Sequence, residues 1–380
     1  MTPTVSFVVP CYRLAHLLRD CIDSVLCQTY SNFEVLIMDD CSPDNTPEVG
    51  HSFRDVRVKY IRNESNLGHL RNYNKGISLT RGEYVWLISA DDYLRRPYIL
   101  QRYVNLLDRN PQVGYTFCPG VGVRNGLETQ ILGYSVHGNR DRIIDGHDLL
   151  EKLFRKGNTI VAASVMARRE CYKRISFFPL NMPWTGDWYL WCLFALYFDV
   201  GYFSEPMVCY REHDLSMTST LMQGNVDFDC YAAEGVAMSW AIRRKADEAA
   251  WRDVSRNCLH KAANQYARCV VPGSYRTSGS FMTLEQFEES LCRNTANETE
   301  RNWIRARVYA GIGDRYYSQG ELPLAKQFYL AGLQKDPCMA QGLAKWFLLS
   351  LGNPGDYLRR SLRLIRSYLR RSFGHSVKSE

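Results

Sequence analysis

Short apolar runs alternate with helix-like patterns over the first 120 residues. Each apolar run is stopped by polar or turn-forming residues, which is typical of buried strands, and the stretches between them repeat apolar positions every three or four residues, as amphipathic helices do. Strands are expected at 5–9, 34–38, 58–61, 84–88 and 113–118, and helices at 14–28, 67–80 and 97–108. This alternation predicts an α/β fold with a doubly wound, mostly parallel sheet that is covered on both faces.

The pattern changes further along the chain. Residues 119–183 are less regular, with a strand expected at 160–166, and they precede an aromatic-rich helix at 187–198 and a strand at 207–210. After about residue 225 the strand pattern disappears and only helical patterns follow.

Three regions follow from this change. We expect a sheet domain over residues 1–220, a helical domain over 221–355 and a basic amphipathic tail over 356–380. Residues 306–338 resemble one tetratricopeptide repeat, a helical hairpin that stacks on its neighbours. The sequence leaves open whether the helical domain binds a partner, forms a homo-oligomer or supports the sheet domain.

Charge is concentrated at the C-terminal end of the chain. The 380 residues carry a net charge of +7, and residues 356–380 alone contribute +5, with seven Lys/Arg and two Asp/Glu. The remainder is nearly neutral, which argues against nucleic-acid binding across the surface. Residues 357–373 have the pattern of a basic amphipathic helix suited to an anionic membrane surface; the alternative is a terminal helix whose arginines face solvent.

Cysteine usage and hydropathy indicate the compartment. The thirteen cysteines are scattered, odd in number and without a CxxC pair, so we expect free thiols in a reducing cytosol. No signal peptide is visible, and the longest apolar run, 188–198, is about half of the roughly 20 residues that a membrane span needs. We therefore expect a cytoplasmic protein, with the tail as a peripheral contact to the inner face of the cytoplasmic membrane.

Polar residues at strand ends are the candidate chemistry, because ligands of such sheets bind beyond the carboxyl ends of the strands. Asp91 and Asp92 follow the fourth strand, and this pair could hold Mg²⁺ or Mn²⁺ together with a ribose hydroxyl. Tyr12 follows the first strand and Asp40 the second, so a ring and a carboxylate could bind a nucleotide base. The structural alternatives are a turn or helix cap for the aspartate pair and turn chemistry for Asp40.

Several familiar sites have no support in the sequence. No GxGxxG follows the first strand, no GxxxxGK[ST] exists, and neither GxSxG nor HExxH occurs. Nicotinamide-binding, P-loop, serine-hydrolase and zinc-protease chemistry are therefore not indicated.

Five short segments occur in a distinctive order along the first 92 residues. They are Val-Val-Pro-Cys-Tyr12, Ser24-Val-Leu-Cys-Gln-Thr-Tyr30, Phe33 to Asp40, Asn66-Leu-Gly68 with Arg71-Asn72, and Arg81-Gly-Glu-Tyr84 before Asp91-Asp92. Their order and spacing are more specific than any one segment. On these segments, residues 4–218 resemble a family 2 glycosyltransferase with the GT-A fold.

The resemblance implies roles for the donor side of the site. Pro10, Tyr12 and Asp40 would hold the uracil or a related base, and Asp91 the ribose. Asp92, the last acid of a DxD-type motif written here as Ala-Asp-Asp, would bind the metal. Arg71 would lie near the nucleotide; its alternative is a surface arginine.

The resemblance continues after residue 180. Trp184-Thr-Gly-Asp-Trp188 resembles the Glu-Asp-Trp motif of the family, so Asp187 would be the catalytic base, although Gly186 stands where many relatives have Glu. The alternative is that Asp187 is the N-cap of the following helix. In the segment Tyr210-Arg-Glu-His213, His213 would contact the metal or diphosphate and Arg211 the phosphates.

The expected activity is that of an inverting, metal-dependent hexosyltransferase. A sugar would pass from a nucleotide sugar, a UDP-sugar first, to a glycan or lipid-linked glycan in bacterial surface polysaccharide synthesis. The cofactor would be Mn²⁺ or Mg²⁺. Two alternatives are a catalytically inactive scaffold that recruits partners through its helical repeat, and a sugar nucleotidyltransferase.

Overall fold

The computed structural model describes part of the chain in two compact units. The described residues are 2–214, 216, 219, 228–271, 282–339, 344–347 and 349. One unit contains Met1–Glu234 and Ala241–Asn257, and the other contains Gly235–Trp240 and Cys258–Glu380. The boundary expected near residue 220 and the basic tail at 356–380 both lie outside the described residues.

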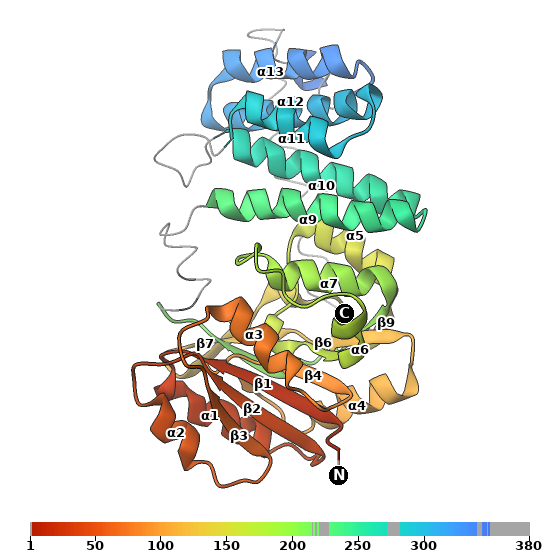
Figure 1. The fold of residues 1–380 in the computed structure, drawn as a ribbon. Helices are drawn as coiled ribbons and strands as arrows, with labels where there is room; N and C mark the ends of the chain where they lie inside the picture. Colours follow the sequence, from red (N-terminus) through yellow and green to blue (C-terminus); the bar gives the residue numbers. More distant parts are fainter. Residues whose placement is uncertain are drawn as a thin grey trace. The chain divides into compact units, whose positions relative to one another are not determined.

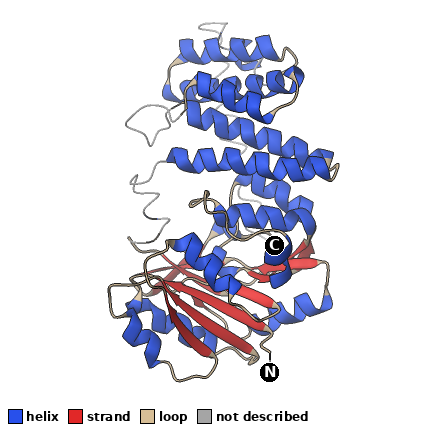
Figure 2. Ribbon diagram, in the orientation of Figure 1, coloured by secondary structure: helices blue, strands red, loops and turns tan. Residues whose placement is uncertain are grey.

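The first unit is built on an eight-stranded sheet in the order β3-β2-β1-β4-β10-β6-β11-β9 (Figures 1 and 2). Its first four strands are parallel, with β1 between β2 and β4. The strands are β1 Val5–Cys11, β2 Phe33–Asp39, β3 Val58–Arg62, β4 Tyr84–Leu87, β6 Val113–Phe117, β9 Arg142–Ile144, β10 Met166–Arg168 and β11 Asp199–Tyr202. The predicted α/β class is confirmed, and the carboxyl ends of β1, β2 and β4 lie together as expected.

Helices cover both faces of the parallel strands (Figure 1). Phe7 and Val9 belong to the core that α1 closes on one face, whereas Val8 meets α3 on the other, where a Cβ on Gly76 would lie only 2.4 Å from it. The helices of this unit are α1 Ala15–Leu26, α2 Thr46–Ser52, α3 His69–Ser78, α4 Ile99–Arg109, α5 Gly146–Lys156, α6 Arg169–Arg174 and α7 Gly186–Tyr197. Burial on both faces explains why the strands read as continuous apolar runs.

A second, four-stranded sheet has the order β5-β12-β7-β8. Its strands are β5 Tyr93–Leu94, β7 Gly120–Arg124, β8 Leu127–Ile131 and β12 Val208–Arg211. Because β12 pairs with β5, the end of β12 reaches the aspartate pair that precedes β5.

The strand expected at 160–166 is wrong. Residues Ala162–Ser164 form a short 3₁₀ helix, in which the Ser164 amide and hydroxyl both donate to the Val161 carbonyl. Only at Met166 does β10 begin, and it pairs antiparallel to β4 and β6. The apolar run is buried without continuous strand pairing, which hydrophobicity alone does not distinguish.

The described residues after 227 form helices and connections, without strands. The helices are α9 Phe228–Glu248, α10 Arg252–Val270, α11 Leu284–Asn294, α12 Glu298–Gln319 and α13 Leu322–Lys335. The repeat-like segment 306–338 falls on α12 and α13, where Gly313 lets the Tyr329 ring approach closely and Gly320 ends α12 with a φ of +87°. Among the helices described, none has the length and apolarity needed to cross a membrane.

Candidate active site

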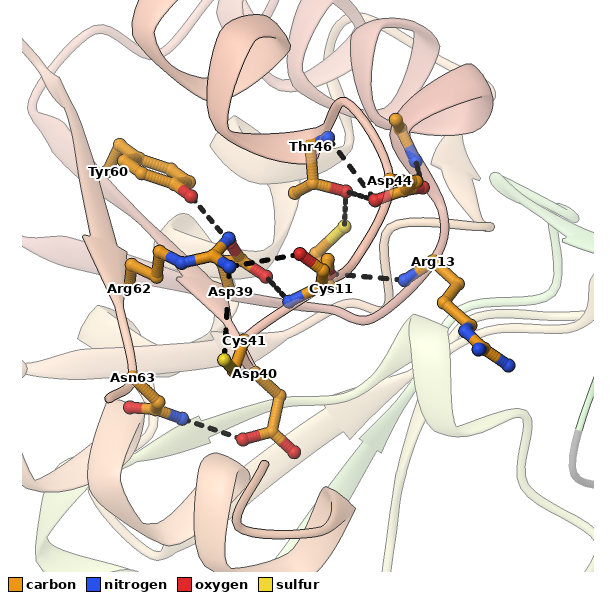
Figure 3. Close-up of polar contacts among 12 residues, drawn as sticks. Cys11, Arg13, Asp39, Asp40, Cys41, Asp44, Thr46, Tyr60, Arg62 and Asn63 are labelled. Carbon is orange, nitrogen blue, oxygen red and sulfur yellow. Dashed lines mark hydrogen bonds and ion pairs between the residues drawn. The ribbon is translucent and has the colours of Figure 1, made fainter. Parts of the chain in front are cut away.

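The carboxyl end of β2 carries two adjacent aspartates with different surroundings (Figure 3). Asp39 is fully buried, accepting the Ser42 amide at 2.8 Å, the Arg62 guanidinium at 2.6 Å and the Tyr60 hydroxyl. Burial, and then the hydrogen bond to Asp39, raises the pKa of Tyr60. These bonds make Asp39 an anchor that ties β3 and the following turn to β2.

Asp40 organises the loop before α3. Its Oδ1 accepts the Asn63 side-chain amide and the Leu67 backbone amide, each at 2.8 Å, and its Oδ2 accepts the Gly68 amide at 2.9 Å. Asp40 is only 3% exposed, and an ionised carboxylate offers about four acceptor positions, so three donors leave one position unused. The turn alternative for Asp40 therefore does not exclude the binding role.

The other base-side residues differ in exposure. Tyr12 is 41% exposed at the end of β1, with the Arg13 guanidinium carbon 5.4 Å from its ring centroid. The carbonyl of Pro10 accepts the Ala90 amide at 3.1 Å, which ties β1 to the loop after β4. Arg71 is exposed on α3. Tyr12 thus offers an open ring face, whereas Pro10 acts through the backbone.

Asp91 and Asp92 lie in the loop between β4 and β5 with separate partners. The Oδ2 of Asp91 is 3.0 Å from the His213 Nε2, and the Oδ1 of Asp92 accepts the Arg211 amide at 3.0 Å. Burial, and then the charge of Asp91, raises the pKa of Asp92. Burial acts the same way on Asp91, but the His213 ring and local hydrogen bonds hold its pKa below the usual value.

The aspartate pair fits a divalent cation whose remaining ligands come from substrate. The Oδ1 of Asp91 is buried without a hydrogen-bond partner in the described part of the chain. Among the residues described, no three His, Cys, Asp or Glu side chains converge on one point. Mg²⁺ and Mn²⁺ accept hard oxygen ligands, and Mg²⁺ usually takes one or two carboxylates together with substrate phosphates and water. An orphaned carboxylate oxygen beside a second carboxylate matches that mode of binding.

Arg211 is the last residue of β12, and His213 lies two residues beyond it. The Arg211 guanidinium bonds the Asp20 carboxylate at 2.6 Å and the Asp91 carbonyl at 3.1 Å. Both residues line a cavity of about 830 Å³, together with Asp20 and His16. His213 therefore touches Asp91 directly, and Arg211 is held between α1 and the aspartate loop.

Asp187 lies in the first turn of α7, where Thr185 is the N-cap, so the N-cap alternative for Asp187 is wrong. Its Oδ2 accepts the Asn158 amide at 2.9 Å and its Oδ1 accepts the Trp188 amide at 2.6 Å. Burial raises the pKa of Asp187. A carboxylate with a raised pKa is better matched to taking a proton near neutral pH.

One pocket of about 230 Å³ joins the aspartate pair to Asp187. Residues from α3 and from the loop before α7 complete its wall. Its lining includes Asp91, Asp92, Asp187, His69, Tyr73, Trp184, Trp191 and Tyr210. The structure thus brings three of the candidate carboxylates together, whereas Tyr12, Asp40 and Arg71 lie outside this lining.

Other residues of the site carry no motif signal. Asn63 bridges Asp40 to Asn72 at 2.9 Å, and Asn158 holds Asp187 from the loop after α5. Tyr73 lines the pocket beside the carboxylates, whose charges add to the effect of burial in raising its pKa. Helical spacing of residues 67–80 could have placed Tyr73 on the α3 face, but nothing local marks Asn158.

The fold of the first unit is of the GT-A type, and comparison with known proteins indicates the family of its sheet domain. The profile described as glycosyl transferase family 2 matches residues 6–176, so the chain carries a family 2 glycosyltransferase domain. An uncharacterized glycosyltransferase of Rickettsia typhi is 27% identical over 224 residues, 58% of this chain and 68% of that protein. Glycosyltransferase GlyG of Streptococcus pneumoniae is 33% identical over 115 residues, 30% of this chain and only 38% of its own length.

Solved structures agree on the fold. The crystal structure of residues 1–349 of S. aureus TarS has a TM-score of 0.56 at 16% identity, covering 94% of this chain and 92% of that one. The same protein in complex with UDP-GlcNAc has a TM-score of 0.55 at 15% identity, with the same coverage. The likeness covers the α/β domain and the helices that follow it.

Proposed function

We propose that this protein is an inverting, metal-dependent hexosyltransferase that uses a UDP-sugar as donor and a glycan or lipid-linked glycan as acceptor. The observation that carries the proposal is the single pocket in which Asp91, Asp92 and Asp187 meet. Membership of the domain in family 2 and the UDP and UDP-GlcNAc complexes of TarS support a nucleotide-sugar donor.

Donor binding would begin at the carboxyl ends of β1 and β2. The exposed ring of Tyr12 stacks on the base, while the remaining acceptor position of Asp40 takes a base N–H. The ribose hydroxyls reach Asp91, and Arg71 lies near the nucleotide. This places the diphosphate towards Asp92, His213 and Arg211.

A cation would be held by Asp92. His213, whose ring contacts the neighbouring Asp91 carboxylate, would lie beside the cation. When bound, Mn²⁺ or Mg²⁺ neutralises charge on the departing diphosphate. Arg211 adds a second positive charge at the phosphates, once its guanidinium exchanges the exposed Asp20 carboxylate for the substrate.

Asp187 would act as the base. Its carboxylate takes the proton of an acceptor hydroxyl, and that oxygen attacks the anomeric carbon from the face opposite the departing diphosphate. One displacement of this kind inverts the configuration and needs no covalent intermediate. Asn158 fixes one carboxylate oxygen, which orients Asp187 towards the acceptor.

The cellular setting is also a proposal. We infer a cytoplasmic enzyme of bacterial surface polysaccharide synthesis, because its relatives include bacterial glycosyltransferases. All thirteen cysteines are free thiols, in keeping with a reducing compartment. Contact of the basic tail with the inner membrane face is proposed from its sequence alone.

A nucleotide-binding screen tests the proposal. Purified protein is heated with UDP, GDP, dTDP or CMP, with and without Mn²⁺, and the melting temperature is recorded. A ligand that binds only the folded state at 100 times its Kd stabilises it by about 2.7 kcal/mol. We expect a Mn²⁺-dependent increase with UDP; no increase with any of the four nucleotides would contradict the proposed donor site.

A further inference from the structure

A second buried carboxylate lies at the start of the helix that carries Asp187. Glu234, on α9, has a side chain that is largely buried, with the residue 8% exposed. Its Oε2 accepts the Thr185 amide at 2.7 Å, the Thr185 hydroxyl at 2.8 Å and the Trp184 amide at 3.0 Å. One oxygen thus gathers three donors from two consecutive residues.

These bonds satisfy the N-cap amide of α7 from outside the helix. The N-cap Thr185 makes no hydrogen bond from its side chain to its own helix. Its hydroxyl instead donates to Glu234, 49 residues along the chain. The backbone N–H groups at a helix start need acceptors, and a negative charge there is favoured by the helix dipole. Glu234 supplies both from a different helix.

The capped segment leads directly into the pocket. Trp184 lines the pocket, Thr185 is the N-cap, and Asp187 follows two residues later. Gly186 separates the cap from Asp187, and a glycine allows the backbone more freedom than other residues. A fixed anchor at Thr185 therefore limits how far the Asp187 carboxylate can move.

A second contact from α9 reaches the same turn. The Trp188 ring stacks on the Tyr231 ring, with centroids 5.9 Å apart and an interplanar angle of 21°. Tyr231 lies three residues before Glu234, so both contacts come from one turn of α9. The first turn of α7 is thus held on either side of Asp187.

We propose that Glu234 is a positioning residue that caps α7 and thereby fixes the Asp187 carboxylate at the pocket. This inference rests on the proposed function, since it concerns the base of that reaction. Small displacements of a catalytic group cost large factors in rate, about 100-fold for 1 Å. Loss of the cap would accordingly lower kcat, while the donor KM would be unaffected.

Three variants of the full chain test this role. Glu234→Ala removes the acceptor. In Glu234→Gln the side-chain carbonyl oxygen can take the place of Oε2 and accept the same three hydrogen bonds. Asp145→Ala is the matched control, because Asp145 caps α5 through two amides and lies outside the pocket lining. Release of UDP from UDP-N-acetylglucosamine with Mn²⁺ gives kcat and KM.

We expect Glu234→Ala to lower kcat at least 10-fold with KM within 2-fold of wild type. Glu234→Gln should recover most of that loss, and Asp145→Ala should leave kcat unchanged. If Glu234→Ala keeps kcat, or if Asp145→Ala lowers it equally, the positioning role is refuted.

Hydrogen exchange tests the cap without turnover. The amides of residues 184–188 should exchange at least 10-fold faster in Glu234→Ala than in wild type, and unchanged exchange would overturn the inference. If wild type releases no UDP while Glu234→Ala still exchanges faster than wild type, the result counts against the proposed function and not against the cap. The two failures are therefore distinguishable.

Discussion

At the residue scale, the adjacent carboxylates of Asp91 and Asp92 have opposite pKa shifts. Burial and the neighbouring charge raise the pKa of Asp92, whereas the His213 ring and local hydrogen bonds lower that of Asp91. A buried carboxylate with a raised pKa is costly to keep ionised unless a cation is near. A cation bound at Asp92, as proposed, would offset this cost.

Asp92→Asn should abolish turnover and leave the fold intact. The amide has nearly the same shape and still accepts the Arg211 amide, but it cannot supply the negative charge. We expect a loss of at least about 1,000-fold in kcat, in the range seen when a group that stabilises transition-state charge is removed. Asp23→Asn, at an exposed position on α1, is the control. It should keep the kcat and the fold of wild type. Near-wild-type turnover by Asp92→Asn would show that the metal assignment is wrong.

Backbone strain next to Asp40 gives a second residue-scale prediction. Cys41 has a φ of +59°, a conformation that costs a non-glycine residue roughly 1–2 kcal/mol. Cys41→Gly should raise the melting temperature, by an amount equivalent to about 1 kcal/mol. Cys27→Gly, at a φ of −75°, is the control and should not stabilise. If both variants destabilise equally, strain at Cys41 is not the cause.

At this scale the sequence predicts residues that belong to ordered motifs and misses those that act across the fold. Asp91, Asp92 and Asp187 line one pocket, and each follows a strand or helix boundary that the sequence pattern indicates. Glu234 and Asn158 were missed because their contacts join segments 49 and 29 residues apart. No local pattern encodes such a contact.

At the scale of elements, the connection between β8 and α5 buries a histidine. His137 lies against the Phe117 and Tyr202 rings, with its Nε2 beside Thr159 and its Nδ1 without a partner among the described residues. Burial, and then the charge of Lys152, lowers the pKa of His137 to about 4. The folded state therefore binds this proton less readily than the unfolded state does.

Stability should fall as the pH falls from about 6.5, the pKa of an unfolded histidine, towards 4. Between pH 7.5 and pH 5 this one group accounts for a loss of about 2 kcal/mol, because the unfolded state takes up the proton first. Urea unfolding at both pH values should show that His137→Gln loses less stability on acidification than wild type. Exposed His16→Gln is the control; equal losses in all three proteins would contradict the role of His137.

Element prediction succeeded where burial is regular. The parallel strands β1, β2 and β4 are buried on both faces, so their apolar runs are unambiguous. Within the run 160–166, residues Ala162–Ser164 form a 3₁₀ turn instead of a strand, because hydrogen bonds of Ser164 to the Val161 carbonyl close the chain locally. Apolar composition is the same in both cases, so hydrophobicity could not separate them.

At the scale of the whole molecule, each of the two units has a separate apolar core. One core surrounds the parallel sheet, and the other joins residues of α9, α10, α11 and α12. Separate cores predict separate unfolding steps. The sequence pattern predicts that the second part of the chain is helical. Its repeat-like segment covers only α12 and α13, and one hairpin is too little to predict a solenoid of stacked repeats.

Calorimetry should show two unfolding transitions. UDP with Mn²⁺ should raise the midpoint temperature of only one of them. The affected transition is assigned to the sheet unit, because every proposed nucleotide contact lies there. In Asp92→Asn the Mn²⁺-dependent part of the shift should vanish, while the other transition stays in place. A single transition, or an equal shift of both, would contradict independent cores.

Asp187 is the proposed base, and it lines a pocket that it shares with the aspartate pair. The most direct test is the rate of UDP-sugar turnover by wild type and by Asp187→Asn across pH, after nucleotide affinity has been shown to be equal. We predict that wild-type kcat falls on acidification with a pKa above the ordinary aspartate value of about 3.9, since burial raises the pKa of Asp187. Asp187→Asn should bind UDP normally but lose this limb and at least about 100-fold of the rate. A variant that keeps wild-type kcat and pH dependence would contradict the account.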